Sequence, residues 1–261
     1  MQIVERRRVV VDLGAATLDP LALRAAVELA ALAGSEFAAL FVEDINLFHL
    51  GSLPFAAEIG LASAAWRPLA TADVERMLRL QAGRLQRALE EAARELAIEW
   101  SFAVARGAPL ASLLEARGDM LVIPGTARGR DARHGDPEQA LRQAFLGGRQ
   151  GGAGRRGPVA VVLGAGMAAD RALESAQALA RSRAAEVLLL ATAGAVELAR
   201  GRAPDLPAIR MIRLPDLIPE TLARALSGAQ ALFWPVPTDA GAAREIDAVR
   251  RLLDCPLVLI R

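Results

Sequence analysis

The sequence predicts an α/β protein made of two tandem copies of a doubly wound design, in which each parallel sheet lies between layers of helices. Three observations support this fold class. The chain matches itself without gaps when shifted by 150 residues, which places residues 9–30 on residues 159–180. Each copy then has the order strand, glycine turn, amphipathic helix and second strand, as a βαβ unit requires. The strand segments are uninterrupted apolar runs, which are typical of parallel strands covered on both faces.

The first half supplies its elements in a regular order. We expect a strand and a helix within residues 9–30, strands over 37–44, 98–105 and 119–125, and helices over 72–97 and 109–116. The helix over 72–97 has the clearest pattern, because Leu78, Leu85, Leu89 and Leu96 recur on one face. The segment that precedes it contains proline and glycine without a period, which predicts a long irregular connection. Residues 131–144 are charged and helix-like.

The second half repeats this order in a shorter form. After the strand and helix of residues 159–180, we expect strands over 186–194, 208–215, 231–237 and 255–261, and helices over 218–227 and 240–253. The predicted domain boundaries are residues 1–145 for the first domain, 146–157 for a glycine-rich linker and 158–261 for the second domain.

Composition and charge exclude several classes of function. The 31 basic and 30 acidic residues leave a net charge of +1, so no overall field attracts nucleic acid or a membrane surface. No apolar stretch is long enough to span a bilayer, and the N-terminus lacks the pattern of a signal peptide, so we expect a cytoplasmic protein. Cys255 is the single cysteine and predicts a buried thiol. Two histidines are too few for most metal sites, and no catalytic set has supporting spacing.

Several segments in series resemble the universal stress protein family, in a tandem arrangement. In the first half these are "VVVDLGAATLDPLALRAAVELA", "ALFVED", "VARGAPLASLLEA" and "DMLVIPGTARG"; in the second half they are "PVAVVLGAGMAADRAL" and "LLDCPLVLIR". The resemblance implies two tandem sheets of the five-stranded parallel type, one per domain, and pairing of domains. The first half lacks a fifth strand of its own before the linker. We therefore expect the halves to pack together and complete each other's sheet edges.

The resemblance also implies positions for an adenine-nucleotide site in the first half. The family's aspartate at the end of strand one aligns with Gly14, while Asp12 lies two residues earlier, inside the expected strand. The backbone contact to adenine falls at Val42. The glycine loop after strand four becomes Gly125, Thr126 and Gly129, which is one residue longer than the family's G-x-x-G and is not followed by its Gly-Ser or Gly-Thr.

These departures favour a stress-linked regulatory or accessory binding protein, without catalytic residues or a metal, whose nucleotide site is degenerate. We expect a homodimer with a further, unidentified protein partner and no obligatory cofactor. One alternative is an ATP or AMP sensor, or a slow ATPase, for which Gly125 and Gly129 are the distinguishing residues.

A second alternative is a dinucleotide-dependent enzyme. Gly164, Gly166 and Ala169 form a G-x-G-x-x-A turn between a strand and a helix. The next strand ends in Thr192 and Ala193 where such enzymes carry an acid for the ribose. Glu43 and Asp44, after the second strand, are the acids plainly placed at the ligand edge of the sheet. Two adjacent acids at a strand end are more typical of capping than of catalysis.

Overall fold

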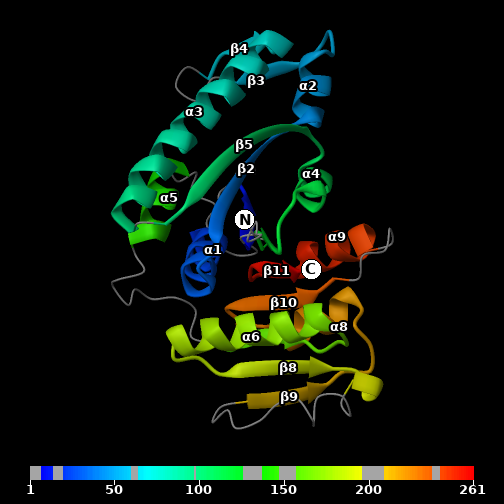
Figure 1. The fold of residues 1–261 in the computed structure, drawn as a ribbon. Coiled ribbons are helices and arrows are strands. Elements are labelled where there is room, and N and C mark those ends of the chain that lie inside the picture. Colours follow the sequence, from blue (N-terminus) through cyan, green and yellow to red (C-terminus); the bar gives the residue numbers. More distant parts are fainter. Residues whose placement is uncertain are drawn as a thin grey trace.

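The computed structural model describes residues 7–13, 20–59, 64–96, 98–125, 137–146, 157–195, 209–236 and 242–261. These residues form one mixed sheet with helices on both faces (Figure 1). The α/β fold class predicted from the apolar runs is therefore confirmed. The structure differs in one respect, because the two expected sheets are joined into one sheet of nine strands.

The nine strands follow the order β5-β2-β1-β6-β11-β10-β7-β8-β9. Their bounds are β1 Arg8–Asp12, β2 Glu36–Asp44, β5 Trp100–Gly107, β6 Met120–Ile123, β7 Val159–Val162, β8 Val187–Ala191, β9 Ile209–Arg213, β10 Ala231–Pro235 and β11 Leu257–Ile260. Neighbouring strands are parallel throughout, except that β11 runs antiparallel to β6. The central strands are buried on both faces, as their continuous apolar sequences require.

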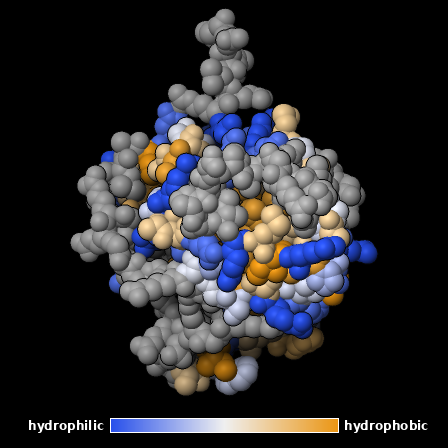
Figure 2. Space-filling model, turned by 90° about the horizontal axis from the view of Figure 1, so that it is seen from below, coloured by the Kyte–Doolittle hydropathy of each residue, from blue (hydrophilic) through white to orange (hydrophobic). Residues whose placement is uncertain are grey.

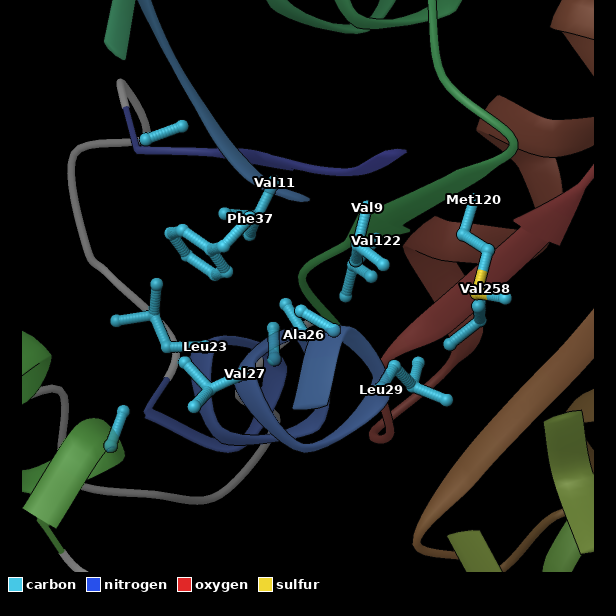
Figure 3. Packing of buried hydrophobic residues seen from close by; sticks show 14 of the residues in the cluster. Val9, Val11, Leu23, Ala26, Val27, Leu29, Phe37, Met120, Val122 and Val258 are labelled. Carbon is cyan, nitrogen blue, oxygen red and sulfur yellow. The ribbon is translucent and has the colours of Figure 1, made fainter. Parts of the chain in front are cut away.

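Helices cover the two faces of this sheet in separate groups. One face packs against α1 Pro20–Ala33, α3 Thr71–Leu96, α5 Pro137–Leu146 and α6 Met167–Ser182; the other packs against α4 Pro109–Glu115, α8 Pro219–Ala225 and α9 Ala242–Leu252. Each resulting core contains residues from both halves of the chain. In Figure 3, Val9 and Val11 of β1 lie over α1, and Leu29 of the same helix lies near Val258 of β11. The halves therefore share their hydrophobic interior.

The internal repeat is preserved at the level of strand register. Val9 pairs with Phe37 in the first half, and Val159 pairs with Val187 in the second, which is the same 150-residue shift on both strands. Beyond each first strand, the backbone N–H of Leu13 donates to the carbonyl of Leu40. Their counterparts, Leu163 and Leu190, make the same hydrogen bond. The repeat read from the sequence is thus a repeat in three dimensions.

Strand β11 completes both halves of the sheet. It lies beside β10 as the fifth strand of the second half, and its other edge pairs with β6 of the first half. Ile260 is opposite Met120 on one side and Pro235 on the other. The expectation that the halves complete each other's edges is confirmed, and β11 pairs with the strand edge of the first half that had no fifth strand of its own. Within the described residues, no strand lies between β6 and β7.

Polar contacts also join the two halves. The Nε atom of Arg183 on α6 donates to Glu28 on α1 at 2.7 Å, and Glu28 also accepts from Arg24 at 2.9 Å. The guanidinium of Arg261 donates to the carbonyl oxygens of Ala116, at 2.9 Å, and of Leu114, both at the end of α4. These bonds span large sequence separations and hold the second half against helices of the first.

The segment before α3 is more ordered than the sequence indicated. It contains a short helix, α2 Ile45–Gly51, and a two-stranded hairpin of β3 Ala57–Ile59 and β4 Trp66–Pro68. Ile59 pairs with Trp66 across the hairpin. The side chains of Phe55 and Trp66 are 79% and 73% exposed. The hairpin is therefore a small surface element outside the main core.

The far edge of the sheet is a charged strand. Arg210 and Arg213 on β9 are exposed, and such charges discourage edge-to-edge association of sheets. Figure 2 views the molecule from below, toward this end of the sheet, and its coloured atoms show hydrophilic residues beside hydrophobic ones. Across the described ranges, no helix has both the length and the apolar character that crossing a membrane requires.

Candidate functional site

The candidate site is the edge of the first half where β1, β2 and β6 end. These strands are parallel to one another and adjacent, with β1 in the middle. In open α/β sheets, ligands bind outside the carboxyl ends of the strands, because turns and helix N-termini present backbone N–H groups there. The residues that end these three strands are therefore the candidate ligand contacts.

Asp12 is the last residue of β1. Its side chain is buried, with 6% of the residue exposed, and its Cα lies opposite that of Leu40 on β2. Asp12 is thus a carboxylate at the end of the first strand, where the resemblance expects an aspartate. Gly14, to which the sequence comparison assigned that position, lies outside the described residues. The 150-residue shift places Val162 at the equivalent point of the second half, so only the first half has this carboxylate.

Val42 lies within β2 rather than at its end. It pairs with Ala105 on β5, its side chain is fully buried, and β2 continues to Asp44. A ligand contact through the backbone of Val42 does not depend on its side chain. The position therefore remains a proposal that rests on the resemblance.

Gly125 follows β6 by two residues and packs against the backbone before β11. A Cβ atom at this position would lie 2.5 Å from the carbonyl oxygen of Cys255 and 2.9 Å from its nitrogen. Real Cβ atoms do not approach backbone so closely, so this contact alone requires glycine. The packing against Cys255 therefore explains why residue 125 is glycine, whether or not a phosphate binds there. Thr126 and Gly129, the other residues of the expected loop, lie outside the described residues.

The acids after Val42 are held in contacts within the chain. Asp44 begins α2 as its N-cap, and its carboxylate accepts from the backbone N–H of Asn46 at 2.9 Å. Glu43 forms a 2.8 Å ion pair with Arg106 of β5. The hydrogen bond to Glu43 raises the pKa of Arg106, and the guanidinium also lies 4.0 Å from the centre of the Phe48 ring. These contacts tie α2 to the ends of β2 and β5.

The corresponding edge of the second half is poorer in ligand groups. Gly166 has a φ of 86°, a left-handed conformation that suits glycine, and it begins α6 without a side-chain cap. The first turn of α6 carries Asp170, whose charge disfavours a phosphate at that helix terminus. β8 ends at Ala191 and is followed by Thr192 and Ala193, so the ribose-binding acid of the dinucleotide pattern is missing. This geometry gives no support to the dinucleotide-dependent enzyme.

The described residues contain no group of three or more His, Cys, Asp or Glu side chains that could hold a metal ion. Cys255 is buried, as its apolar neighbours predicted.

No family model and no curated protein matches the sequence. Among solved structures, a universal stress protein from Archaeoglobus fulgidus DSM 4304 is similar, with a TM-score of 0.52 and 10% sequence identity; the match covers 98% of this chain and 96% of that one. The cytoplasmic domain of a prokaryotic cation chloride cotransporter matches with a TM-score of 0.38 and 14% identity, over 97% of this chain and 95% of that one. At these identities, the comparison concerns the fold. Across nearly its whole length, the chain has a universal-stress-protein-like fold.

Proposed function

We propose that the chain is a stress-linked regulatory protein that binds one adenine nucleotide, ATP or AMP, at the strand ends of its first half. The observation that carries this proposal is Asp12, a buried carboxylate at the end of β1. A carboxylate in this place can accept hydrogen bonds from the ribose hydroxyls or the amino group of a nucleotide. Val162 in the second half cannot, so one nucleotide per chain is expected.

Regulation is proposed in preference to turnover because the neighbouring acids have structural partners. Asp44 caps α2 and Glu43 pairs with Arg106. Neither carboxylate is therefore placed to activate an attacking water. In this proposal the bound nucleotide changes the surface that a partner protein recognises, and the second half supports the first through the shared sheet.

The test is isothermal titration of the full chain with ATP, AMP and NAD. We expect saturable binding of ATP or AMP with one site per chain, and no binding of NAD. Asp12→Asn should weaken the affinity about tenfold or more, because hydrogen bonds to a charged group contribute about 1.5–3 kcal/mol. The matched control is Asp170→Asn in the equivalent helix of the second half, which should leave the affinity unchanged. Thermal unfolding of both variants verifies that they fold.

Two outcomes would contradict this site. One is stoichiometric binding of two nucleotides per chain, which would mean that the second half also binds. The other is unchanged affinity in folded Asp12→Asn, which would place the nucleotide elsewhere.

A second candidate function follows from Gly125. Because the approach of Cys255 accounts for this glycine, it supplies no independent evidence for a phosphate loop. The chain would then be a regulatory module that binds a protein partner without a nucleotide. Absence of heat change with ATP, AMP and NAD at concentrations of about 1 mM would favour this candidate over the first.

A further inference from the structure

The outer face of α3 is a largely exposed helical surface of the first half, and Glu91 near its C-terminal end pairs with Arg142 of α5. α3 has 26 residues, and its core-facing row includes Leu78, Leu85 and Leu89. Figure 1 shows it along the outside of the molecule, with α5 beside its C-terminal part. A helix of this length extends for about 39 Å. Its opposite row of side chains is available to another molecule.

The members of this outer row are three or four residues apart, a spacing that keeps side chains on one face of a helix. Its members are Asp73, Arg76, Leu80, Gly83, Arg87, Glu91 and Arg94. Leu80 is 59% exposed although it is a large apolar side chain.

Gly83 lies at the centre of α3, and packing within the chain does not explain it. Among the described residues, no heavy atom lies within 4 Å of the position that its Cβ would occupy. Glycine in the interior of a helix weakens that helix relative to alanine. A glycine on an exposed helix face allows the backbone of a second helix to approach closely, which is the role that we assign to it.

The charges of the outer row are complementary to those of the same row running in the opposite direction. When two α3 helices are laid antiparallel about Gly83, Asp73 faces Arg94 of the second copy and Arg76 faces Glu91 of the second copy. Twofold symmetry makes each of these pairs occur twice. In the same alignment, Leu80 meets the aliphatic part of Arg87 of the second copy.

One neighbouring register of the two helices is unfavourable. A displacement of one turn places Asp73 opposite Glu90 of the second copy and Arg76 opposite Arg87 of the second copy, so that like charges meet. The charge pattern therefore favours the register about Gly83 over this displaced one, as e and g charges select a register in helix pairs.

The occupant that fits this face is a second copy of the chain. β11 is paired on both sides within the chain, so it cannot also serve as an edge for pairing between chains. We propose that two copies associate through the outer faces of α3, antiparallel, about a twofold axis near Gly83. Within one chain, Arg76 already pairs with Asp73, and Glu91 pairs with Arg142. These are exposed pairs, which contribute little and can be shared with the second copy.

The experiment is analytical ultracentrifugation of the full chain over a range of concentrations and salt. We expect a reversible dimer that weakens as salt is raised, because its polar contacts are exposed. Arg76→Glu and Glu91→Arg should each raise the dissociation constant at least tenfold, since each places like charges opposite one another. The double variant Arg76→Glu/Glu91→Arg should recover the dimer, because the exchanged charges are again complementary.

The matched control is Arg251→Glu on α9. Arg251 resembles Arg76 in exposure, at 68% against 67% for the side chains, and in its 2.6 Å ion pair to an aspartate of the same helix. This variant should leave the dimer unchanged. Gly83→Gln gives an independent readout: its longer side chain should weaken the dimer, whereas its higher helix propensity should raise the unfolding midpoint of the monomer.

The proposal is overturned by a chain that remains monomeric at all concentrations. It is equally overturned by a dimer that tolerates both single charge reversals, or by a double variant that fails to recover association.

Discussion

At the scale of single residues, the two halves differ in charge at Asp12 and Val162, which end the first strand of each half. They occupy equivalent points of the repeat, and only Asp12 has a side chain that can accept a hydrogen bond. Sequence comparison placed the acid position at Gly14 because it was anchored on the helix that follows. In the structure β1 ends at Asp12, and the described part of α1 is Pro20–Ala33. The distance from strand to helix is not fixed by an alignment of the helix alone.

Gly125 gives a prediction at this same scale. Gly125→Ala should lower the free energy of unfolding by about 1–3 kcal/mol, because its Cβ would overlap the backbone of Cys255. Equilibrium unfolding in urea measures the change. Gly194→Ala is the control, since no heavy atom lies within 4 Å of its Cβ position and its stability should be nearly unchanged. If both variants unfold with the same free energy, the backbone near Gly125 can shift to accommodate a Cβ atom without loss of stability.

At the scale of elements, long periodic segments were predictable and short ones were not. The apolar row of α3 fixed that helix to within a residue at each end, and the apolar run of β2 did nearly the same. α2 and the β3–β4 hairpin were missed, because each is too short to show a period. The signal for α2 was local, because Asp44 is an N-cap residue. Its carboxylate accepts a hydrogen bond from the backbone N–H of Asn46, two residues later. The location of the candidate site and the assignment of Gly14 to it both stay predictions, because Gly14 lies outside the described residues.

Helix α9 supplies the prediction on pH. Burial raises the pKa of Asp247, but hydrogen bonds from Arg250 and Arg251 outweigh it and leave the pKa below its ordinary value. A lowered pKa in the folded state stabilises the protein above the unfolded value of about 3.9, and this stabilisation is lost as the pH falls through the folded pKa. Asp247→Asn should therefore cost up to about 1 kcal/mol at pH 7, and the difference should disappear in acid.

The measurement is urea unfolding of the wild type and Asp247→Asn at several pH values. Glu174→Gln on α6 is the control, because Glu174 is exposed and makes no ion pair among the described residues. A destabilisation of Asp247→Asn that is the same at pH 2 and pH 7 would show that packing, not charge, is responsible.

At the scale of the whole molecule, the shared strand makes the two halves one folding unit. The sequence indicated a closing strand and an incomplete first half. It could not show that one strand serves both, because strand pairing between distant segments depends on how the helices pack. Leu259 on β11 is 1% exposed and lies opposite Trp234 on one side and Leu121 on the other.

Leu259→Ala should therefore destabilise both halves together. We expect a loss of about 2–5 kcal/mol and a single unfolding transition, with hydrogen-exchange protection falling in β6 and β10 alike. Leu32→Ala on α1, where the residue is 47% exposed, should have a much smaller effect. If hydrogen exchange becomes faster in β10 while β6 keeps its protection, the two halves unfold as independent units and the prediction is wrong.

The position of β11 has a consequence for protein synthesis. The ribosome completes β6 long before it reaches residues 257–260. Until β11 emerges, the edge of β6 that pairs with it has no partner. A truncated mRNA that ends before β11 would give a polypeptide with an exposed β6 edge, which could pair with strands of other chains. Chaperone demand during translation should accordingly be greatest in the interval between the emergence of β6 and the emergence of β11.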